Sequence, residues 1–283
     1  MEQIRSKREI DQQAENVVCG FLKKYLFDAM IANTHSSTRA VEWMNQMLDK
    51  KRQLRGVDFQ LYRTDKKEPY KIDAKAQVSV VNAGFPTFCK ELLSYQNGYP
   101  VDGWFINDDL TTQFYAYTYI KAESDDQTLL SEDTIKSLYV IFVDKKVLRH
   151  YCKLCLGMDE RTLRDCAKQI SKHSGSKELS DFFKKMIPDK RIHFTESKQL
   201  SEAPVNLIVS IDLLQELSIA QYEVDKNGYR VVNDVPSGYL RGGITKWPEM
   251  ERKKLQNYDT IKWFVDSVQQ IYKQWPLDGE RMV

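Results

Sequence analysis

Two aspartates and a lysine lie on segments in which apolar and polar residues alternate. Asp58 stands in Val57–Leu61, where the odd positions are apolar. Asp73 and Lys75 stand in Ile72–Gln77, where the even positions are apolar. Because the side chains of a strand point alternately to its two faces, each segment is predicted to be a strand. Its charged residues then share one face and its apolar residues share the other.

A short polar turn around Asp65–Lys66 joins the two segments and sets their expected register. If the hairpin closes symmetrically about this turn, Leu61 faces Tyr70 and Asp58 faces Asp73. A shift by one residue would bring an apolar side chain onto the charged face, which burial disfavours. Directly opposed residues have Cβ atoms about 4.5–5.5 Å apart, so the two carboxylates are expected to lie close together.

Two carboxylates at this separation repel each other unless a cation lies between them. Oxygen atoms are the ligands that Mg²⁺ takes in proteins, so Asp58 and Asp73 are candidate ligands for Mg²⁺ (or Mn²⁺). Lys75 would project beside them, and Gln77 follows on the same predicted face. An exposed hairpin face with ordinary surface charges is the alternative that the pattern leaves open.

A long amphipathic helix is predicted ahead of the hairpin, over residues 7–31, because apolar residues recur there at helical spacing. Glu15 lies at the edge of its apolar stripe, where a carboxylate can point toward a site at the rim of the sheet. A solvated position on the flank of the helix is the other interpretation of Glu15. A second helix is predicted over residues 38–50, with Glu42 on its far face.

The rest of the chain predicts alternating helices and strands. Before residue 145, the pattern favours a helix over 87–96 and strands over 104–107, 111–122 and 137–144. After it, the pattern favours helices within 145–187, over 212–219 and over 251–275, strands over 191–195, 204–210 and 228–233, and a loop over 234–250.

These elements predict an α/β protein with a mixed central sheet flanked by helices. A boundary near residue 145 would separate a core of residues 1–145 from an α+β C-terminal extension of residues 146–283. As an alternative, the strands at 191–210 complete the first sheet, so that the extension belongs to the same domain.

Composition excludes little. The chain has 42 Lys and Arg against 40 Asp and Glu in 283 residues, so any basic surface for nucleic acid must be local. Two loose clusters qualify: Lys50, Lys51, Arg52 and Arg55 beside the hairpin, and Arg230, Arg241, Lys246 and Arg252 around the Gly-rich loop. The sequence has neither a signal-peptide pattern nor an apolar run of membrane-spanning length, so a cytoplasmic protein is expected.

The stretch Gly56–Gln77 resembles the active-site signature of the PD-(D/E)xK nuclease superfamily, which has the restriction-endonuclease-like fold. In that signature an acidic residue on one strand is followed by D/E-x-K on the next, as Asp58 is here by Asp73-Ala74-Lys75. Gly56-Val57-Asp58 also looks like the context of the first acid in these enzymes. Gln77 matches a polar follower of the lysine, and Glu15 matches the glutamate on a preceding helix in many members. The resemblance is tight over about 20 residues and loose over roughly 140, in the order helix, strand, strand, helix, strand.

This resemblance implies a metal-dependent endonuclease that hydrolyses phosphodiester bonds in DNA. Asp58, Asp73 and Lys75 would be catalytic, with Gln77 and Glu15 as further members. Asp58, Asp73 and Glu15 would hold Mg²⁺ or Mn²⁺. A homodimer fits cleavage of both strands of a duplex, which needs two sites. The alternatives are a non-catalytic nucleic-acid-binding module with a nuclease-like core, an RNA-directed nuclease, and a structural or interaction protein.

Overall fold

A computed structural model of the chain describes residues 7–234, apart from 34–37, 44–55, 65–66, 177–178, 180, 184–186, 188, 199 and 201. The loop and final helix predicted after residue 234 lie outside the described residues. So do the residues of the two basic clusters, apart from Arg230. None of the helices in the described part combines the length and the apolar character that crossing a membrane requires.

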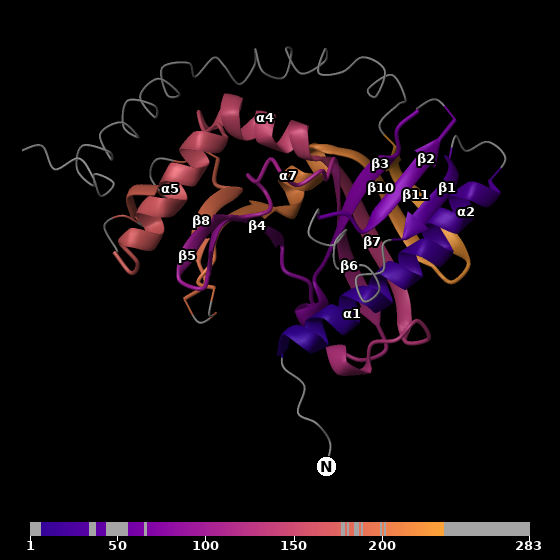
Figure 1. The fold of residues 1–283 in the computed structure, drawn as a ribbon. Coiled ribbons are helices and arrows are strands. Elements are labelled where there is room, and N and C mark those ends of the chain that lie inside the picture. The colour runs from indigo at the N-terminus through magenta and orange to yellow at the C-terminus, as the bar shows by residue number, and fades with distance from the viewer. Residues whose placement is uncertain are drawn as a thin grey trace, which may run out of the picture. The chain divides into compact units, whose positions relative to one another are not determined.

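The chain forms two compact units, each built from separated segments (Figure 1). Among the described residues, the first unit contains those up to Pro86, then Asp109–Lys145, and then those from Leu214 onward; the second contains Thr87–Asp108 and Lys146–Leu213. Within the described residues, the chain passes between the units after Lys145, near the predicted boundary, and also after Pro86, Asp108 and Leu213.

The first unit is organised around a mixed seven-stranded sheet in the order β1-β2-β3-β6-β7-β10-β11. Every neighbouring pair is antiparallel except β3 and β6, which are parallel. The predicted mixed sheet in an α/β protein is therefore confirmed. The strands are β1 (Thr38–Trp43), β2 (Phe59–Arg63), β3 (Tyr70–Ala76), β6 (Phe114–Ala122), β7 (Ile135–Asp144), β10 (Ser218–Asp225) and β11 (Gly228–Asp234).

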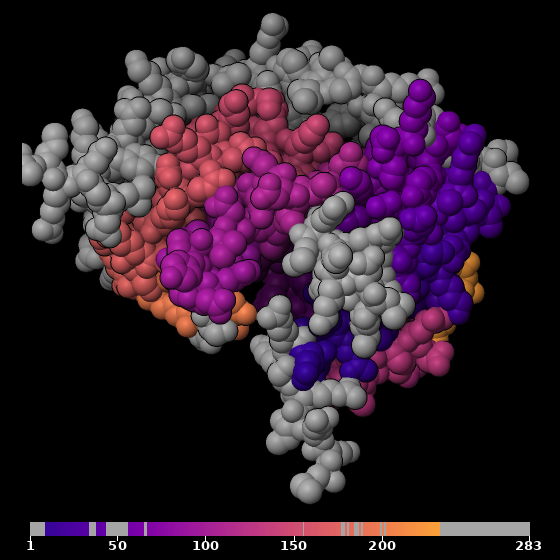
Figure 2. Space-filling model, in the orientation of Figure 1, coloured from indigo at the N-terminus to yellow at the C-terminus, as the bar shows by residue number. Residues whose placement is uncertain are grey.

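One continuous helical run packs on this sheet, as predicted for residues 7–31. It consists of α1 (Lys7–Leu22), a π-helical turn (Lys23–Phe27) and α2 (Asp28–Ala32). Its apolar side chains join those of β2, β3, β6 and β7 in one buried core, whose members include Phe21, Leu22, Phe59, Ile72 and Ala116. In the space-filling view, the indigo helix α1 and the purple β2–β3 hairpin reach the molecular surface (Figure 2).

The second unit holds a four-stranded antiparallel sheet in the order β5-β4-β9-β8. The strands at 191–210 are therefore present, but they do not extend the first sheet. The elements of this unit are β4 (Thr87–Gln96), β5 (Tyr99–Asp102), α4 (Lys145–Cys155), α5 (Glu160–Lys172), β8 (Ile192–Glu196) and β9 (Val205–Ser210). Short helical elements in the described part of the chain include two 3₁₀ turns, Val78–Val80 and Gln127–Leu129, and α7 (Ile211–Glu216).

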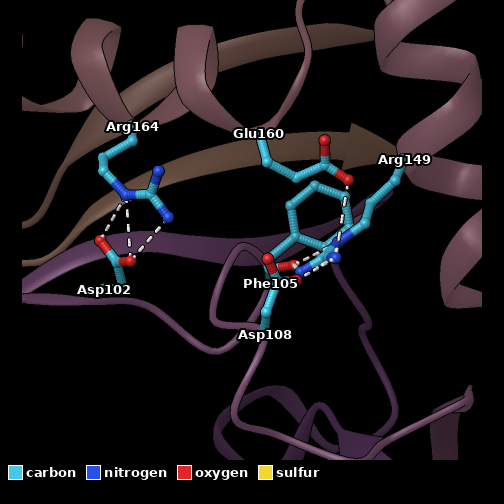
Figure 3. Close-up of polar contacts among 6 residues, drawn as sticks. All are labelled: Asp102, Phe105, Asp108, Arg149, Glu160 and Arg164. Carbon is cyan, nitrogen blue, oxygen red and sulfur yellow. Dashed lines mark hydrogen bonds and ion pairs between the residues drawn. The ribbon is translucent and has the colours of Figure 1, made fainter.

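Two arginines tie the helices of the second unit to the segment that follows β4 (Figure 3). Arg164 makes a bidentate contact with Asp102, at 2.8 and 2.7 Å. Arg149 donates to the Phe105 carbonyl from Nε and Nη2, at 2.9 and 2.7 Å, and pairs with Asp108 at 2.7 Å. Its Nη1 also lies 3.5 Å from Glu160. Each arginine therefore spans two elements that are distant in sequence.

Two predicted helices are strands in the structure. Residues 38–43 of the predicted 38–50 helix form β1, where buried Val41 and partly buried Trp43 share a face at strand spacing and Glu42 lies exposed. Residues 87–96 form β4, which pairs with both β5 and β9. Pairing on one or both sides supplies the backbone hydrogen bonds that a helix would make internally, so sheet contacts override local propensity.

One predicted strand is a turn. At residues 104–107, the N–H groups of Ile106 and Asn107 both donate to the Gly103 carbonyl, at 3.1 and 3.0 Å, which closes the backbone on itself. Phe105 and Ile106 are fully buried there, so the apolar run reflects burial rather than strand pairing. Conversely, β10 falls mostly on residues for which no element was predicted.

Candidate active site

The β2–β3 hairpin has the predicted register. Leu61 lies opposite Tyr70, Gln60 opposite Lys71, and Phe59 opposite Ile72. Asp58 comes directly before β2, and its N–H donates to the Ile72 carbonyl at 2.8 Å. The antiparallel contact therefore continues one residue past the end of the strand, and places Asp58 next to the segment that carries Asp73.

Gly56 sets the entry into this hairpin. Its φ is +64°, a conformation that other residues rarely adopt, and its carbonyl accepts a hydrogen bond from the Thr112 hydroxyl. A side chain at this position would also meet Thr112 Oγ1 at 3.0 Å. The glycine of the Gly-Val-Asp sequence is thus required by the turn that aims Asp58 toward β3.

Asp58 is 5% exposed and reaches across to β3. Its Oδ2 accepts a hydrogen bond from the Ala74 N–H at 2.8 Å. Ala74 stands between Asp73 and Lys75, so this bond holds the first carboxylate at the part of β3 that carries the other two charged groups. One Asp58 oxygen is engaged with the backbone in this way.

Asp73 and Lys75 form an ion pair on the face of β3 opposite the core residue Ile72. Lys75 Nζ lies 2.8 Å from Asp73 Oδ1. Asp73 is 4% exposed, whereas the Lys75 side chain is 31% exposed. The aspartate is thus enclosed, and the lysine retains access to solvent.

Burial and neighbouring charges alter the proton affinity of both groups. Burial raises the pKa of Asp73, Lys75 offsets part of this effect, and the charge of Asp58 adds to it, so the pKa is about 7. Burial lowers the pKa of Lys75, but the charges of Asp73 and Asp58 outweigh burial and raise it above its usual range. Lys75 is therefore a cation at neutral pH, while Asp73 is poised to gain or lose a proton.

Glu15 of α1 belongs to the same electrostatic environment. Burial raises the pKa of Glu15, the charge of Lys75 lowers it, and the charge of Asp58 raises it. The thiol of Cys19, one helical turn further along, also has a raised pKa, because of its burial and the charges of Asp58, Glu15 and Asp73. Glu15, Asp58 and Asp73 are named the carboxylate cluster below. The ammonium group of Lys75 accompanies its three carboxylates.

Gln77 points to a different partner. Its side-chain Oε1 accepts from the Phe85 N–H at 2.6 Å, and its Nε2 donates to the Phe85 carbonyl at 3.1 Å. The amide thereby closes the loop of residues 78–86. The structure thus brings Asp58, Asp73, Lys75 and Glu15 into one electrostatic group. Gln77 instead binds the loop of residues 78–86, which directly follows it in the chain.

Two tyrosines of β6 adjoin the site and escaped the sequence reasoning. In the parallel register, Tyr115 lies beside Asp73 and Tyr117 beside Lys75, with ring centroids 5.7 Å apart. Both rings are fully buried. Burial, the neighbouring Tyr115 and the charge of Asp73 raise the pKa of Tyr117. The alternating aromatic residues of 111–122 predict a strand, but they do not predict that it pairs with β3.

The donor types suit a divalent cation, because carboxylate oxygens are the ligands that Mg²⁺ and Mn²⁺ prefer. The sequence predicts Asp58, Asp73 and Glu15 as the residues that would hold such an ion. Among the described residues, no three His, Cys, Asp or Glu side chains are grouped closely enough to enclose a metal by themselves. Mg²⁺ commonly keeps several waters and uses only one or two protein carboxylates, so a partial protein shell fits this chemistry.

Comparison of the chain with protein-family models, curated proteins and solved structures finds no match.

Proposed function

We propose that this protein is a metal-dependent endonuclease that hydrolyses phosphodiester bonds in DNA. The proposal rests above all on one observation: Asp58 is held against Ala74, between Asp73 and Lys75, in a hairpin whose register follows from the sequence. Two enclosed carboxylates that could hold a metal ion, with a cation beside them, are groups suited to metal-assisted phosphodiester hydrolysis. The resemblance of this hairpin to the PD-(D/E)xK signature supports the same interpretation.

Each group has a distinct role in the proposed reaction. A bound Mg²⁺ or Mn²⁺ would supply charge neutralisation and lower the pKa of a coordinated water. Asp58 and Asp73 would hold that ion, and Glu15 would orient a water in its outer shell. Lys75, protonated and 31% exposed, would hold a non-bridging oxygen of the scissile phosphate. Its raised pKa favours this electrostatic role over proton abstraction.

The restriction-endonuclease-like fold is part of the proposal, and the strand order bears on it. Helix α1, the β2–β3 hairpin and the parallel strand β6 supply a scaffold for the signature. The segment at 87–96, where the resemblance calls for a helix, is strand β4. The match is therefore firmer at the hairpin than over the longer order of elements.

Cleavage of supercoiled plasmid DNA tests the proposal. The full chain is incubated with Mg²⁺ or Mn²⁺, and in parallel with EDTA. We expect nicked or linear DNA only with metal, and a loss of about 100-fold or more in Asp73→Asn and Lys75→Met. Lys136→Met and Asp133→Asn are matched controls, because both residues are exposed on the same unit. Cleavage that survives in both site variants would refute the assignment.

A further inference from the structure

Phe85 exposes its ring although its backbone is firmly held. The residue is 57% exposed, at the end of the loop of residues 78–86. An apolar ring in water costs free energy that burial would recover. Such exposure is ordinary on a loose loop, where the ring can fold back onto the protein. The contacts of this loop therefore decide whether the exposure of Phe85 is significant.

Three hydrogen bonds fix the backbone of Phe85. Gln77 engages both its N–H and its carbonyl, at 2.6 and 3.1 Å, and the Tyr119 hydroxyl donates to the same carbonyl at 3.0 Å. Gly84, which precedes it, has a φ of +64°, and a side chain there would meet the Tyr119 ring at 2.8 Å. The turn is therefore pressed against β6 and directs the ring outward.

The remainder of the loop is anchored as well. Val78 and Val81 are buried beneath it. Asn82 donates from its N–H to the Ile120 carbonyl at 3.0 Å and accepts from the Ala122 N–H at 2.8 Å. Lys121, which is exposed, donates to the Asn82 carbonyl at 2.5 Å. The loop is thus tied to β6 along its length, and a cation lies at its base.

This held ring is close to the candidate site along the chain. Gln77, which hydrogen-bonds the backbone of Phe85, follows Lys75 by two residues, a separation of about 6–7 Å along extended backbone. A ring with a fixed backbone loses little conformational freedom when a ligand stacks on it. Aromatic side chains beside cations are the usual means of binding unpaired bases, with the base on the ring and the phosphate near the cation.

We propose that Phe85 is a stacking platform for an unpaired base, so that the protein binds single-stranded DNA in preference to an intact duplex. The inference rests on the proposed nuclease function and specifies its substrate class. A base inside a duplex is already stacked on both sides and offers Phe85 no free face, whereas a single strand does. Lys121 would contact the backbone of the same strand.

Binding of a short fluorescein-labelled oligothymidine to the full chain tests this, by fluorescence anisotropy in EDTA so that no cleavage occurs. We expect Phe85→Ala to raise the Kd about tenfold, and Phe85→Trp to keep or lower it. Leu129→Ala is the matched control, since Leu129 is an equally exposed apolar residue of the same unit, at 59%. The Kd of Leu129→Ala for the single strand should stay within about twofold of the wild-type value. The Kd of Phe85→Ala for a duplex should also stay within about twofold of the wild-type value.

Several results would overturn the inference. The wild-type chain fails to bind the single strand, or Phe85→Ala binds it as well as the wild type does, or Leu129→Ala is weakened equally. An oligonucleotide of abasic sites separates stacking from backbone contact, because Phe85→Ala should leave its binding unchanged. Cleavage of the same oligothymidine with Mn²⁺, by the wild type and by the Asp73→Asn variant, is scored separately. A failure of the nuclease proposal is therefore distinguishable from a failure of the platform.

Discussion

The Oδ2 atom of Asp58 lies 2.8 Å from the backbone nitrogen of Ala74, and accepts its hydrogen bond. This bond joins the residue ahead of β2 to the middle of β3, where Asp73 and Lys75 flank Ala74. Asp58 consequently has two separable properties: an oxygen that completes the hydrogen bonding of β3, and a negative charge that adds to the carboxylate cluster.

Substitutions at Asp58 should separate these properties. Asp58→Asn keeps an oxygen that can accept from Ala74 and removes repulsion with Asp73, so its free energy of unfolding without metal should equal or exceed that of the wild type. Asp58→Ala leaves the Ala74 N–H without this acceptor, and should lose about 1–3 kcal/mol. Urea denaturation measures both. In either variant, the thermal stabilisation by Mn²⁺ should disappear. Equal stability of the two variants would show that the hydrogen bond contributes nothing.

Metal-free stability should fall as pH rises through the range in which Asp73 titrates. Its folded-state pKa of about 7 exceeds the ordinary value of 3.8, so the folded protein holds this proton more tightly than the unfolded chain does. The resulting stabilisation is complete below about pH 4 and is lost progressively up to about pH 7. Chemical denaturation in EDTA at a series of pH values measures this loss. Asp73→Asn should reduce the slope across that window, while Glu15, whose pKa burial also raises, retains part of it. A slope unchanged by the substitution would assign the titration elsewhere.

The same proton should compete with metal. Below about pH 7, the apparent affinity for Mn²⁺ should rise with pH, by at most tenfold per unit for one displaced proton, and then level off. Isothermal titration calorimetry in buffers of different ionisation enthalpy reports both the affinity and the proton released. Binding that is independent of pH across this range would mean that Asp73 is not a ligand.

A glycine of the second unit provides a test of packing. A side chain at Gly103 would lie 2.4 Å from the backbone carbon and oxygen of Glu91 in β4. Gly103→Ala should therefore destabilise the protein by about 3 kcal/mol. Gly98→Ala is the control, because Gly98 has a φ of +81° with no atom within 4 Å, and strain there should cost only about 1 kcal/mol. Urea midpoints compare them, and similar losses would argue against the tight contact.

The two arginines Arg149 and Arg161 should differ in their contributions to stability. Arg149 has a side chain 14% exposed and binds the Phe105 carbonyl and Asp108 (Figure 3). Arg149→Met should cost about 1–3 kcal/mol, because a buried carbonyl loses its donor. Arg161, 88% exposed and 4.0 Å from Asp165, should contribute at most about 0.5 kcal/mol. Thermal denaturation of the two methionine variants compares them, and equal losses would contradict this account.

The hairpin was predictable from sequence because two strict constraints agree there. Burial fixes which residues of β2 and β3 face the core, and the turn fixes their register. The long N-terminal helix and the apolar strand β7 were predictable for a similar reason, since each has one strong periodic signal. Local patterns of this kind need no knowledge of distant segments.

Segments whose partners are remote could not be predicted in this way. The residues of β4 suit a helix by composition. Only the end of β4 pairs with the nearby β5, and most of the strand pairs with β9, more than one hundred residues later. The same holds within the site. The placement of Tyr117 beside Lys75 depends on the β3–β6 register. The hydrogen bond between Gln77 and the Phe85 backbone depends on the conformation of the loop of residues 78–86. Neither leaves a signal in the sequence near the residue concerned.

The interleaving of the two units determines when each can fold. Strand β4 must wait for β9, and β7 waits for β10 as its second neighbour. The four-stranded sheet is therefore complete only when the chain has been made to Ser210, and the seven-stranded sheet only when it has been made to Asp234. Contacts of such high sequence separation slow folding and prolong the exposure of apolar strand edges. A fragment ending near residue 145 would leave β7 as an uncovered edge prone to aggregation. Activity and binding are therefore best measured on the whole chain, expressed slowly and at low temperature.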